Sequence, residues 1–80
     1  MSQEKSQNEI FIKQLADRIK SLRMKKGYTS YEAFAFDNNI PRAQYGRYER
    51  GVDLRCSSLK KVVDALDISM EEFFSEGFSE

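Results

Sequence analysis

Apolar side chains recur at helical spacing through the first third of the chain. Between Asn8 and Lys26 the apolar positions lie three or four residues apart, at Ile12, Leu15, Ala16, Ile19 and Leu22. This spacing predicts an amphipathic helix over about Asn8–Lys26. Gly27 comes directly after this segment and suits a helix C-cap, because glycine adopts the left-handed conformation at little cost.

A second, shorter helix is expected after this glycine. Thr29 and Glu32 have the spacing of a capping box, in which a hydroxyl and a carboxylate three residues apart satisfy the first free N–H groups of a helix. The pattern predicts a helix over about Ser30–Asn38. Phe34 and Ala35 are its expected buried positions.

A tight turn and a third helix follow. Asn38 and Asn39 interrupt the helical pattern, and asparagine tolerates the left-handed conformation that tight turns often require. Pro41 fits the first turn of a new helix, which we expect to end at about Glu49 or Arg50. The residues of this region expected to face inward are Ile40, Tyr45 and Tyr48.

Two more helices complete the predicted domain. The fourth begins at Cys56 or Ser57, and its apolar stripe consists of Leu59, Val62, Val63 and Leu66. Ser69 and Glu72 form a second capping-box pattern that opens a short fifth helix. The fold class is therefore all-α, a compact bundle of five helices. We expect a flexible N-terminus over 1–7, one domain over 8–76 and a C-terminal tail over 77–80.

Composition argues against an enzyme. The chain of 80 residues contains no histidine and one cysteine, Cys56. It therefore lacks the commonest general base and any thiolate cluster for a metal. Its four glycines are scattered, so it has no phosphate loop. We expect no catalytic residue, no cofactor and no metal, and interpret the chain as a binding protein. It has no apolar run long enough for a membrane span and a polar N-terminus, which favour a cytoplasmic location.

The neutral net charge hides a strong asymmetry. Residues 13–61 contain 12 Lys/Arg and 5 Asp/Glu, whereas residues 62–80 contain no Lys/Arg and 6 Asp/Glu. Such a distribution favours a basic working face with an acidic end turned away from it. The alternative is that the clustered charges only solvate the surface.

Three residues around the predicted tight turn have the spacing of a helix-turn-helix. The inner face of the first short helix needs a small residue, and Ala35 stands there. Four residues later the turn needs a residue that accepts positive φ, where Asn39 stands. Six residues further an apolar side chain must hold the second helix to the core, where Tyr45 stands.

Over about Ile19 to Phe74 the chain resembles the lambda-repressor-like (Cro/repressor, XRE) family of helix-turn-helix regulators. The resemblance is carried by Ile19, Leu22, Arg23, Gly27, Ser30, Phe34, Ala35, Ile40, Tyr48-Glu49-Arg50-Gly51, Leu59, Val63, Ala65, Leu66, Ile68, Ser69 and Phe73. It implies a small bacterial or phage-type transcriptional regulator, a repressor or controller, that binds an inverted repeat of double-stranded DNA as a dimer. It also implies a structural pair between Arg23 and Glu49.

A recognition helix places its early outward residues against base edges in the major groove. The expected base contacts are Arg42, Ala43, Gln44 and Arg47, because guanidinium groups pair with guanine, amides with adenine, and methyl groups with thymine. The expected phosphate contacts are Ser30, Tyr31, Arg50, Arg55 and Ser57. The alternative is that the arginines bind only phosphates or remain in solvent.

Three phenylalanines lie close to the C-terminal end, at Phe73, Phe74 and Phe78. Some must complete the core, and the surplus predicts a homodimer contact, because exposed aromatic clusters are seldom unused. The alternative is that all three are intramolecular. A second functional hypothesis also stays open: the chain is a protein-interaction module, such as an antitoxin, that docks a partner through this acidic, aromatic end.

Overall fold

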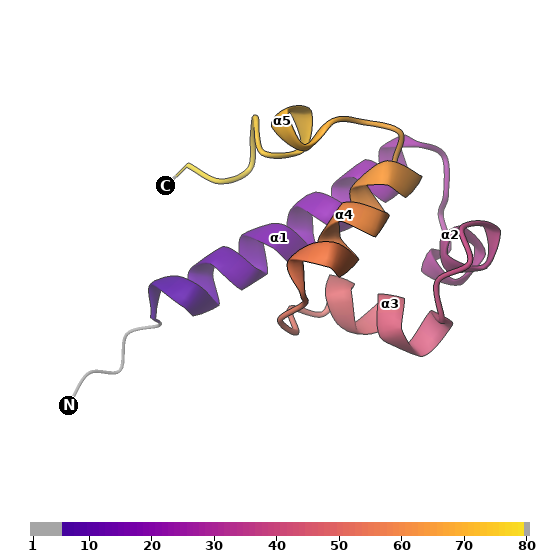
Figure 1. Cartoon of the computed structure of the whole chain (residues 1–80), viewed down its shortest axis with the longest axis horizontal. Helices are drawn as coiled ribbons and strands as arrows, with labels where there is room; N and C mark the ends of the chain where they lie inside the picture. The colour runs from indigo at the N-terminus through magenta and orange to yellow at the C-terminus, as the bar shows by residue number, and fades with distance from the viewer. Residues whose placement is uncertain (1–5, 80) are drawn as a thin grey trace.

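Between residues 6 and 79 the chain forms five helices and no strand. A computed structural model describes these residues. Helix α1 covers Gln7–Lys25, α2 Tyr31–Asp37, α3 Arg42–Glu49, α4 Cys56–Ala65 and α5 Met70–Phe73. Figure 1 shows α1 running along the long axis, with α4 crossing in front of it in this view, α2 and α3 at the lower right, and α5 above α1. The all-α prediction is confirmed.

The first helix begins one residue earlier than expected. The hydroxyl of Ser6 accepts a hydrogen bond from the Glu9 N–H, and the Glu9 carboxylate accepts one from the Ser6 N–H, both at 3.1 Å. This is a complete capping box, so α1 begins inside the segment 1–7 that was expected to be a flexible N-terminus. The rest of that prediction, residues 1–5, lies outside the described residues.

The second helix is capped by a different hydroxyl from the one predicted. Ser30, not Thr29, is the N-cap, and its oxygen accepts a hydrogen bond from the Ala33 N–H at 3.2 Å. Gly27 takes a positive φ of 107°, as its expected C-cap role requires, and the chain then needs Tyr28 and Thr29 to reach the next helix. The expected capping box between Thr29 and Glu32 is therefore absent: the cap moves to Ser30, and the residue three positions on is Ala33, which has no side chain that could accept from the Ser30 N–H.

The core is formed by the predicted stripes of all five helices. Ile19, Phe34, Tyr45, Val62 and Phe73 are completely buried, and Leu15, Leu22, Ile40, Tyr48, Leu59 and Leu66 are nearly so. Burial of these apolar surfaces is the main favourable contribution to folding. Because α1 packs against α3 as well as α2, the core holds α3 from one side and leaves its other side at the surface.

The C-terminal residues pack on the domain more than expected. Phe78 lies against the core, and a Cβ at Gly77 would be 3.5 Å from the Arg18 side chain. Arg18 is itself buried and reaches this end of the chain: its Nε donates to the Phe73 carbonyl at 2.8 Å. Phe78 thus packs on the domain from within the segment expected to be a C-terminal tail.

Candidate nucleic-acid interface

Helix α3 presents one buried side and one exposed side. Tyr45 and Tyr48 fill the buried side, and the Tyr45 ring lies 5.2 Å from that of Phe34 on α2. The exposed residues are Arg42, Ala43, Arg47 and Arg50. At 100° per residue these four share one arc of about 140°, opposite the two tyrosines. The structure therefore presents a mostly cationic helix face to solvent.

The turn between α2 and α3 sets the angle of that face. Asn39 has a φ of 59°, which asparagine accepts more readily than most residues. The Ile40 N–H donates to the Ala35 carbonyl at 2.9 Å, and both side chains are buried. The small side chain of Ala35 allows the turn to close against the end of α2. The predictions of a small residue at Ala35, a left-handed residue at Asn39 and a buried anchor at Tyr45 are confirmed, as is the inward position of Ile40.

Pro41 occupies the N-cap position of α3 and not its first turn. It has the extended ψ of 131°, and no side chain caps the free N–H groups that follow. The sequence expectation is thus displaced by one residue, and α3 begins with Arg42. Its free N–H groups lie beside the exposed arginine.

Gln44 lies at the border between the two sides of α3. It is half-buried, and its Nε2 donates a hydrogen bond to the hydroxyl of Tyr48. The amide is therefore held by the helix that carries it, one turn away. Its carbonyl oxygen and its second N–H are left for another partner, since a side-chain amide has two donors and one acceptor oxygen.

A buried polar network fixes the C-terminal end of α3 to α1. Arg23 donates to Glu49 through Nη2 at 2.8 Å and Nε at 3.1 Å, and also to the Tyr28 carbonyl at 2.8 Å. The Tyr45 hydroxyl donates to the same carboxylate. The two ion-paired side chains are only 5% and 8% exposed. Because both side chains are almost completely buried, they connect helices and leave little surface to a ligand.

The network shifts two proton equilibria. The hydrogen bond to Glu49 raises the pKa of Arg23 further above its usual value, against the opposing effect of burial. Burial, and then the hydrogen bond to Glu49, raises the pKa of Tyr45 far above its usual value. Both groups keep their protons throughout the neutral range, which maintains the pairing.

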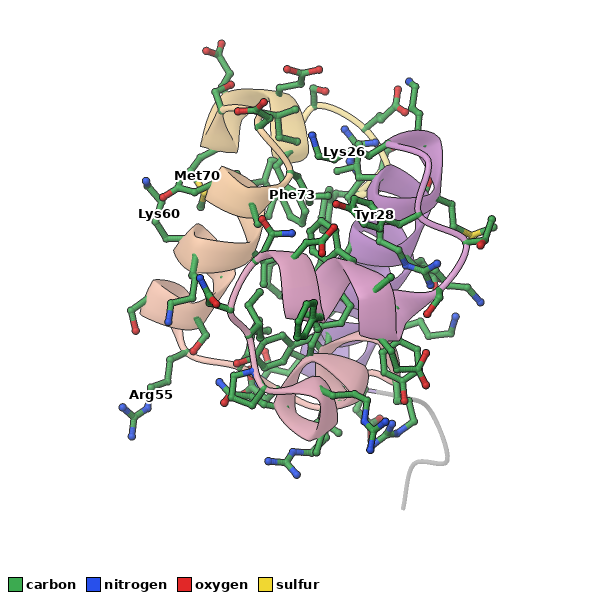
Figure 2. The ribbon with its side chains drawn as sticks, turned by 90° about the vertical axis from the view of Figure 1, so that its right-hand side faces the viewer. Lys26, Tyr28, Arg55, Lys60, Met70 and Phe73 are labelled. Carbon is green, nitrogen blue, oxygen red and sulfur yellow. The ribbon has the colours of Figure 1, made fainter. Side chains whose placement is uncertain are left out.

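The five expected phosphate contacts surround α3. Ser30 and Tyr31 stand at the start of α2, Arg50 ends α3, and Arg55 and Ser57 flank the start of α4. Figure 2 shows Arg55 projecting from the same end of the molecule as α3, while Lys26 lies at the opposite end. The Ser30 hydroxyl is already engaged, because it caps α2 and donates to Glu32 at 3.0 Å.

A polar hollow lies between α3 and the start of α4. Its lining includes Gln44, Arg47 and Arg55 together with Ser58. Ser58 is a residue that sequence reasoning missed, having chosen its neighbour Ser57. The helical spacing from Leu59 and Val62 could have placed Ser58 on the α3 side, because Ser58 precedes Val62 by one turn.

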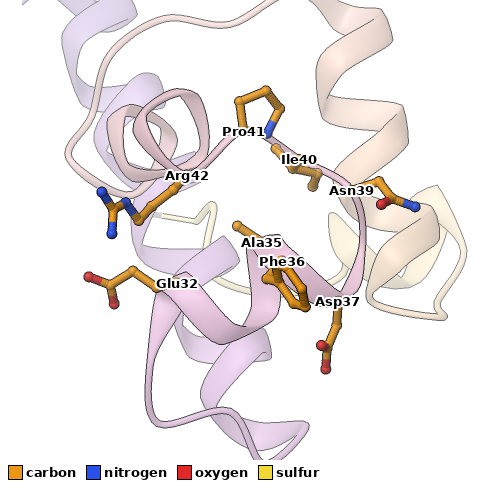
Figure 3. A pocket seen from close by; sticks show the side chains of 8 residues that line it. All are labelled: Glu32, Ala35, Phe36, Asp37, Asn39, Ile40, Pro41 and Arg42. Carbon is orange, nitrogen blue, oxygen red and sulfur yellow. The ribbon is translucent and has the colours of Figure 1, made fainter.

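A notch between α2 and α3 was also missed. Figure 3 shows Glu32 and Arg42 reaching toward the same side of it, with Phe36 beside the turn. Phe36 is 83% exposed, the largest value among the big apolar side chains. Its position two residues after buried Phe34 is the available signal, since such residues point to different sides of a helix.

The C-terminal phenylalanines divide between core and surface. Phe73 is completely buried, so it has no surface for a second chain, and its expected dimer contact is wrong. Phe74 is 38% exposed and Phe78 is half-buried. Phe74 stacks on Phe11 of α1, with ring centres 6.4 Å apart, and the two rings line a groove that sequence reasoning did not foresee.

Within residues 6–79, no helix has the length and apolar character to cross a membrane. The same residues contain no group of three or more potential metal ligands. A family model described as Helix-turn-helix matches residues 19–73. No curated protein and no solved structure matches the chain. The matched segment begins inside α1 and ends with α5, so it includes the turn, α3 and the anchoring network.

Proposed function

The chain belongs to the Cro/C1-type helix-turn-helix (XRE) family of DNA-binding regulators, and we propose that it is a sequence-specific regulator that reads the major groove with α3. It acts as a homodimer on an inverted repeat, as a repressor or controller in the cytoplasm. The proposal is supported above all by the cationic arc of α3, with the opposite side of that helix buried against the core.

Direct readout is assigned to the start and middle of α3. Arg42 and Arg47 are exposed and can present a bidentate donor pair to guanine O6 and N7. Ala43 lies between them on the arc and offers its methyl group to thymine. Gln44 pairs with adenine through its carbonyl oxygen and its second N–H, while the first N–H stays bonded to Tyr48.

Backbone contacts are assigned to the rim of α3. Tyr31, Arg50, Arg55 and Ser57 provide hydroxyl and guanidinium donors, which phosphate oxygens accept. Ser58, which lines the hollow beside Arg55, joins this set. Ser30 acts mainly through the capping of α2, because its hydroxyl is already bonded.

The proposal includes a dimer because the recognition helix is short. Helix α3 has eight residues, and one such helix reads few base pairs. Phe74 and Phe78 are the proposed contact residues, with Phe11 beside them. Phe74 and Phe78 follow α5 and Phe11 lies on α1, all of them outside α3, so a second copy leaves the cationic arc free.

The test is selection from a randomised duplex pool at low and at physiological salt, followed by sequencing. We expect an enriched motif of two inverted half-sites that Arg42→Ala/Arg47→Ala no longer retains. A matched control is Lys20→Ala/Lys26→Ala, which removes one exposed charge from α1 and one from its C-cap. Equal loss in both double variants would reduce the role of α3 to general attraction. No retention at either salt would refute DNA binding and favour a protein-interaction module.

A further inference from the structure

Gly46 stands in the middle of α3, where glycine is about 1 kcal/mol less favourable than alanine. The structure shows what occupies the space of the missing side chain. A Cβ at Gly46 would lie 3.1 Å from Tyr31 Cε1 and 3.1 Å from Arg50 Nη1. These distances are shorter than ordinary van der Waals contact. The phenol ring from α2 and the guanidinium from the end of α3 therefore meet over this glycine.

The two groups differ in how firmly they are held. The Tyr31 ring is half-buried and stacks on Tyr45, with centres 6.3 Å apart and planes inclined by 28°. Tyr45 is in turn held by Phe34 and Glu49. Arg50, by contrast, is exposed. The ring is thus a fixed wall, and the arginine lies along the surface beside it.

The guanidinium of Arg50 and the hydroxyl of Tyr31 are both available to a ligand. Among residues 6–79, no ion pair involves Arg50, and no hydrogen bond involves its guanidinium or the Tyr31 hydroxyl. The carbon that bears this hydroxyl, Cζ, would be 3.5 Å from the same Cβ. A cation and a neutral donor therefore meet over Gly46, within the cationic arc. Together they match one phosphate group, whose oxygens accept from both.

We propose that Tyr31 and Arg50 form one binding site for a single DNA phosphate, and that Gly46 is the positioning residue whose missing side chain lets them converge. The inference rests on the proposed DNA binding and deepens it. The sequence suggested two separate backbone contacts, one at the start of α2 and one after α3. The structure joins them over a residue that itself offers no side chain to DNA.

The test is Gly46→Ala, measured by duplex binding over a series of salt concentrations and by thermal unfolding. The helix preference of alanine and the 3.1 Å contact of its Cβ with the Tyr31 ring oppose each other, so we expect little change in the unfolding temperature. We expect duplex affinity to fall about tenfold, as for loss of one charge-assisted hydrogen bond. The plot of log K against log salt should become shallower by about one, because one phosphate contact is lost.

A double-mutant cycle shows whether Gly46 acts through Arg50. In the Arg50→Ala background, Gly46→Ala should have almost no further effect on affinity or salt slope. Tyr31→Phe, which removes only the hydroxyl, should weaken binding while keeping the stack on Tyr45. Lys26→Ala is the control for loss of one exposed charge at the other end of the molecule.

Two results would overturn the proposal while DNA binding by the unmodified chain stands. One is a folded Gly46→Ala variant with unchanged affinity and salt slope. The other is additive effects of Gly46→Ala and Arg50→Ala, which would mean that each acts alone. If the unmodified chain binds no duplex at any salt, the proposed function itself has failed.

Discussion

Two ion pairs of this protein have the same length and very different surroundings. Arg23–Glu49 and Lys60–Asp64 both have an N–O distance of 2.8 Å. The side chains of the first pair are 5% and 8% exposed, and those of the second are 58% and 59% exposed. Burial, and not distance, should therefore decide how much each pair contributes to stability.

The perturbation is Glu49→Gln, which keeps the volume of the side chain and removes its charge. The buried Arg23 then keeps only one hydrogen bond to an uncharged amide oxygen in place of a bidentate pair, and Tyr45 loses a charged acceptor. Each hydrogen bond to a charged group contributes about 1.5–3 kcal/mol. Complete loss of one partner of a buried pair costs about 3–5 kcal/mol. We expect the conservative change to lower the free energy of unfolding by about 2–3 kcal/mol.

The matched control is Asp64→Asn in the exposed pair. Exposed pairs one helical turn apart contribute about 0.3–0.5 kcal/mol, so its effect should be small and should vanish at high salt. The assay is urea unfolding at neutral pH, followed by helical circular dichroism at low and high salt. For a domain of this size, the expected loss in Glu49→Gln lowers Tm by roughly 10–20 °C.

Equal shifts of the unfolding midpoint in the two variants would refute the reasoning. So would a Glu49→Gln effect that disappears at high salt, because a buried pair is screened only weakly. If Glu49→Gln does not fold, Tyr45→Phe provides a second measurement, since it removes one hydrogen bond of the same network and no charge. It should still cost more than Asp64→Asn.

Three other predictions concern stability alone. Asn39→Val should cost about 1–2 kcal/mol in chemical unfolding, because Asn39 has a φ of 59°, whereas Asn39→Gly should cost far less. Stability should fall as pH rises above 10.0, because there the unfolded Tyr45 releases a proton that burial makes the folded one retain; Tyr45→Phe should make this decline shallower in unfolding measured across that range. Phe36→Ser should change the unfolding free energy by less than about 0.5 kcal/mol, since Phe36 is 83% exposed, and a larger loss in thermal unfolding would show that it packs in solution.

The helices and their inner faces were predictable because periodicity alone determines them. Leu59, Val62 and Val63 recur at helical spacing, and the structure buries all three. Caps were less predictable. Thr29 and Ser30 both carry a hydroxyl, and the choice between them depends on how many residues the chain needs after Gly27 to reach α2. The spacing of apolar residues does not reveal how long the connection between Gly27 and α2 must be.

The contacts between helices could be known only from the family resemblance or from the structure. The pairing of Arg23 with Glu49 spans 26 positions and was implied only by the resemblance. The convergence of Tyr31 and Arg50 over Gly46 has no periodic signal, because it depends on where α2 crosses α3. The C-terminal phenylalanines show the same limit. Their count predicted that some would be buried, but only the fold selects Phe73.

The basic segment carries fewer free charges than its composition suggests. Of the 12 Lys/Arg in residues 13–61, four form ion pairs with acids of the described chain: Lys13, Arg18, Arg23 and Lys60. Arg18 even serves the acidic end, since it binds the carbonyls of Phe73 and Glu72 and the carboxylate of Glu76. Part of the basic charge therefore holds α5 and the residues after it against α1.

What remains around α3 is a set of arginines. Arg42, Arg47, Arg50 and Arg55 are all exposed and, within residues 6–79, have no acidic partner within ion-pair distance. Arginine offers a rigid fork that fits guanine edges and phosphates, while lysine acts as a point charge. A surface that only had to be soluble would not need arginine in preference to lysine. Replacing the four together by lysine keeps the charge and the salt dependence, so a loss of sequence preference in that variant would trace recognition to the guanidinium groups.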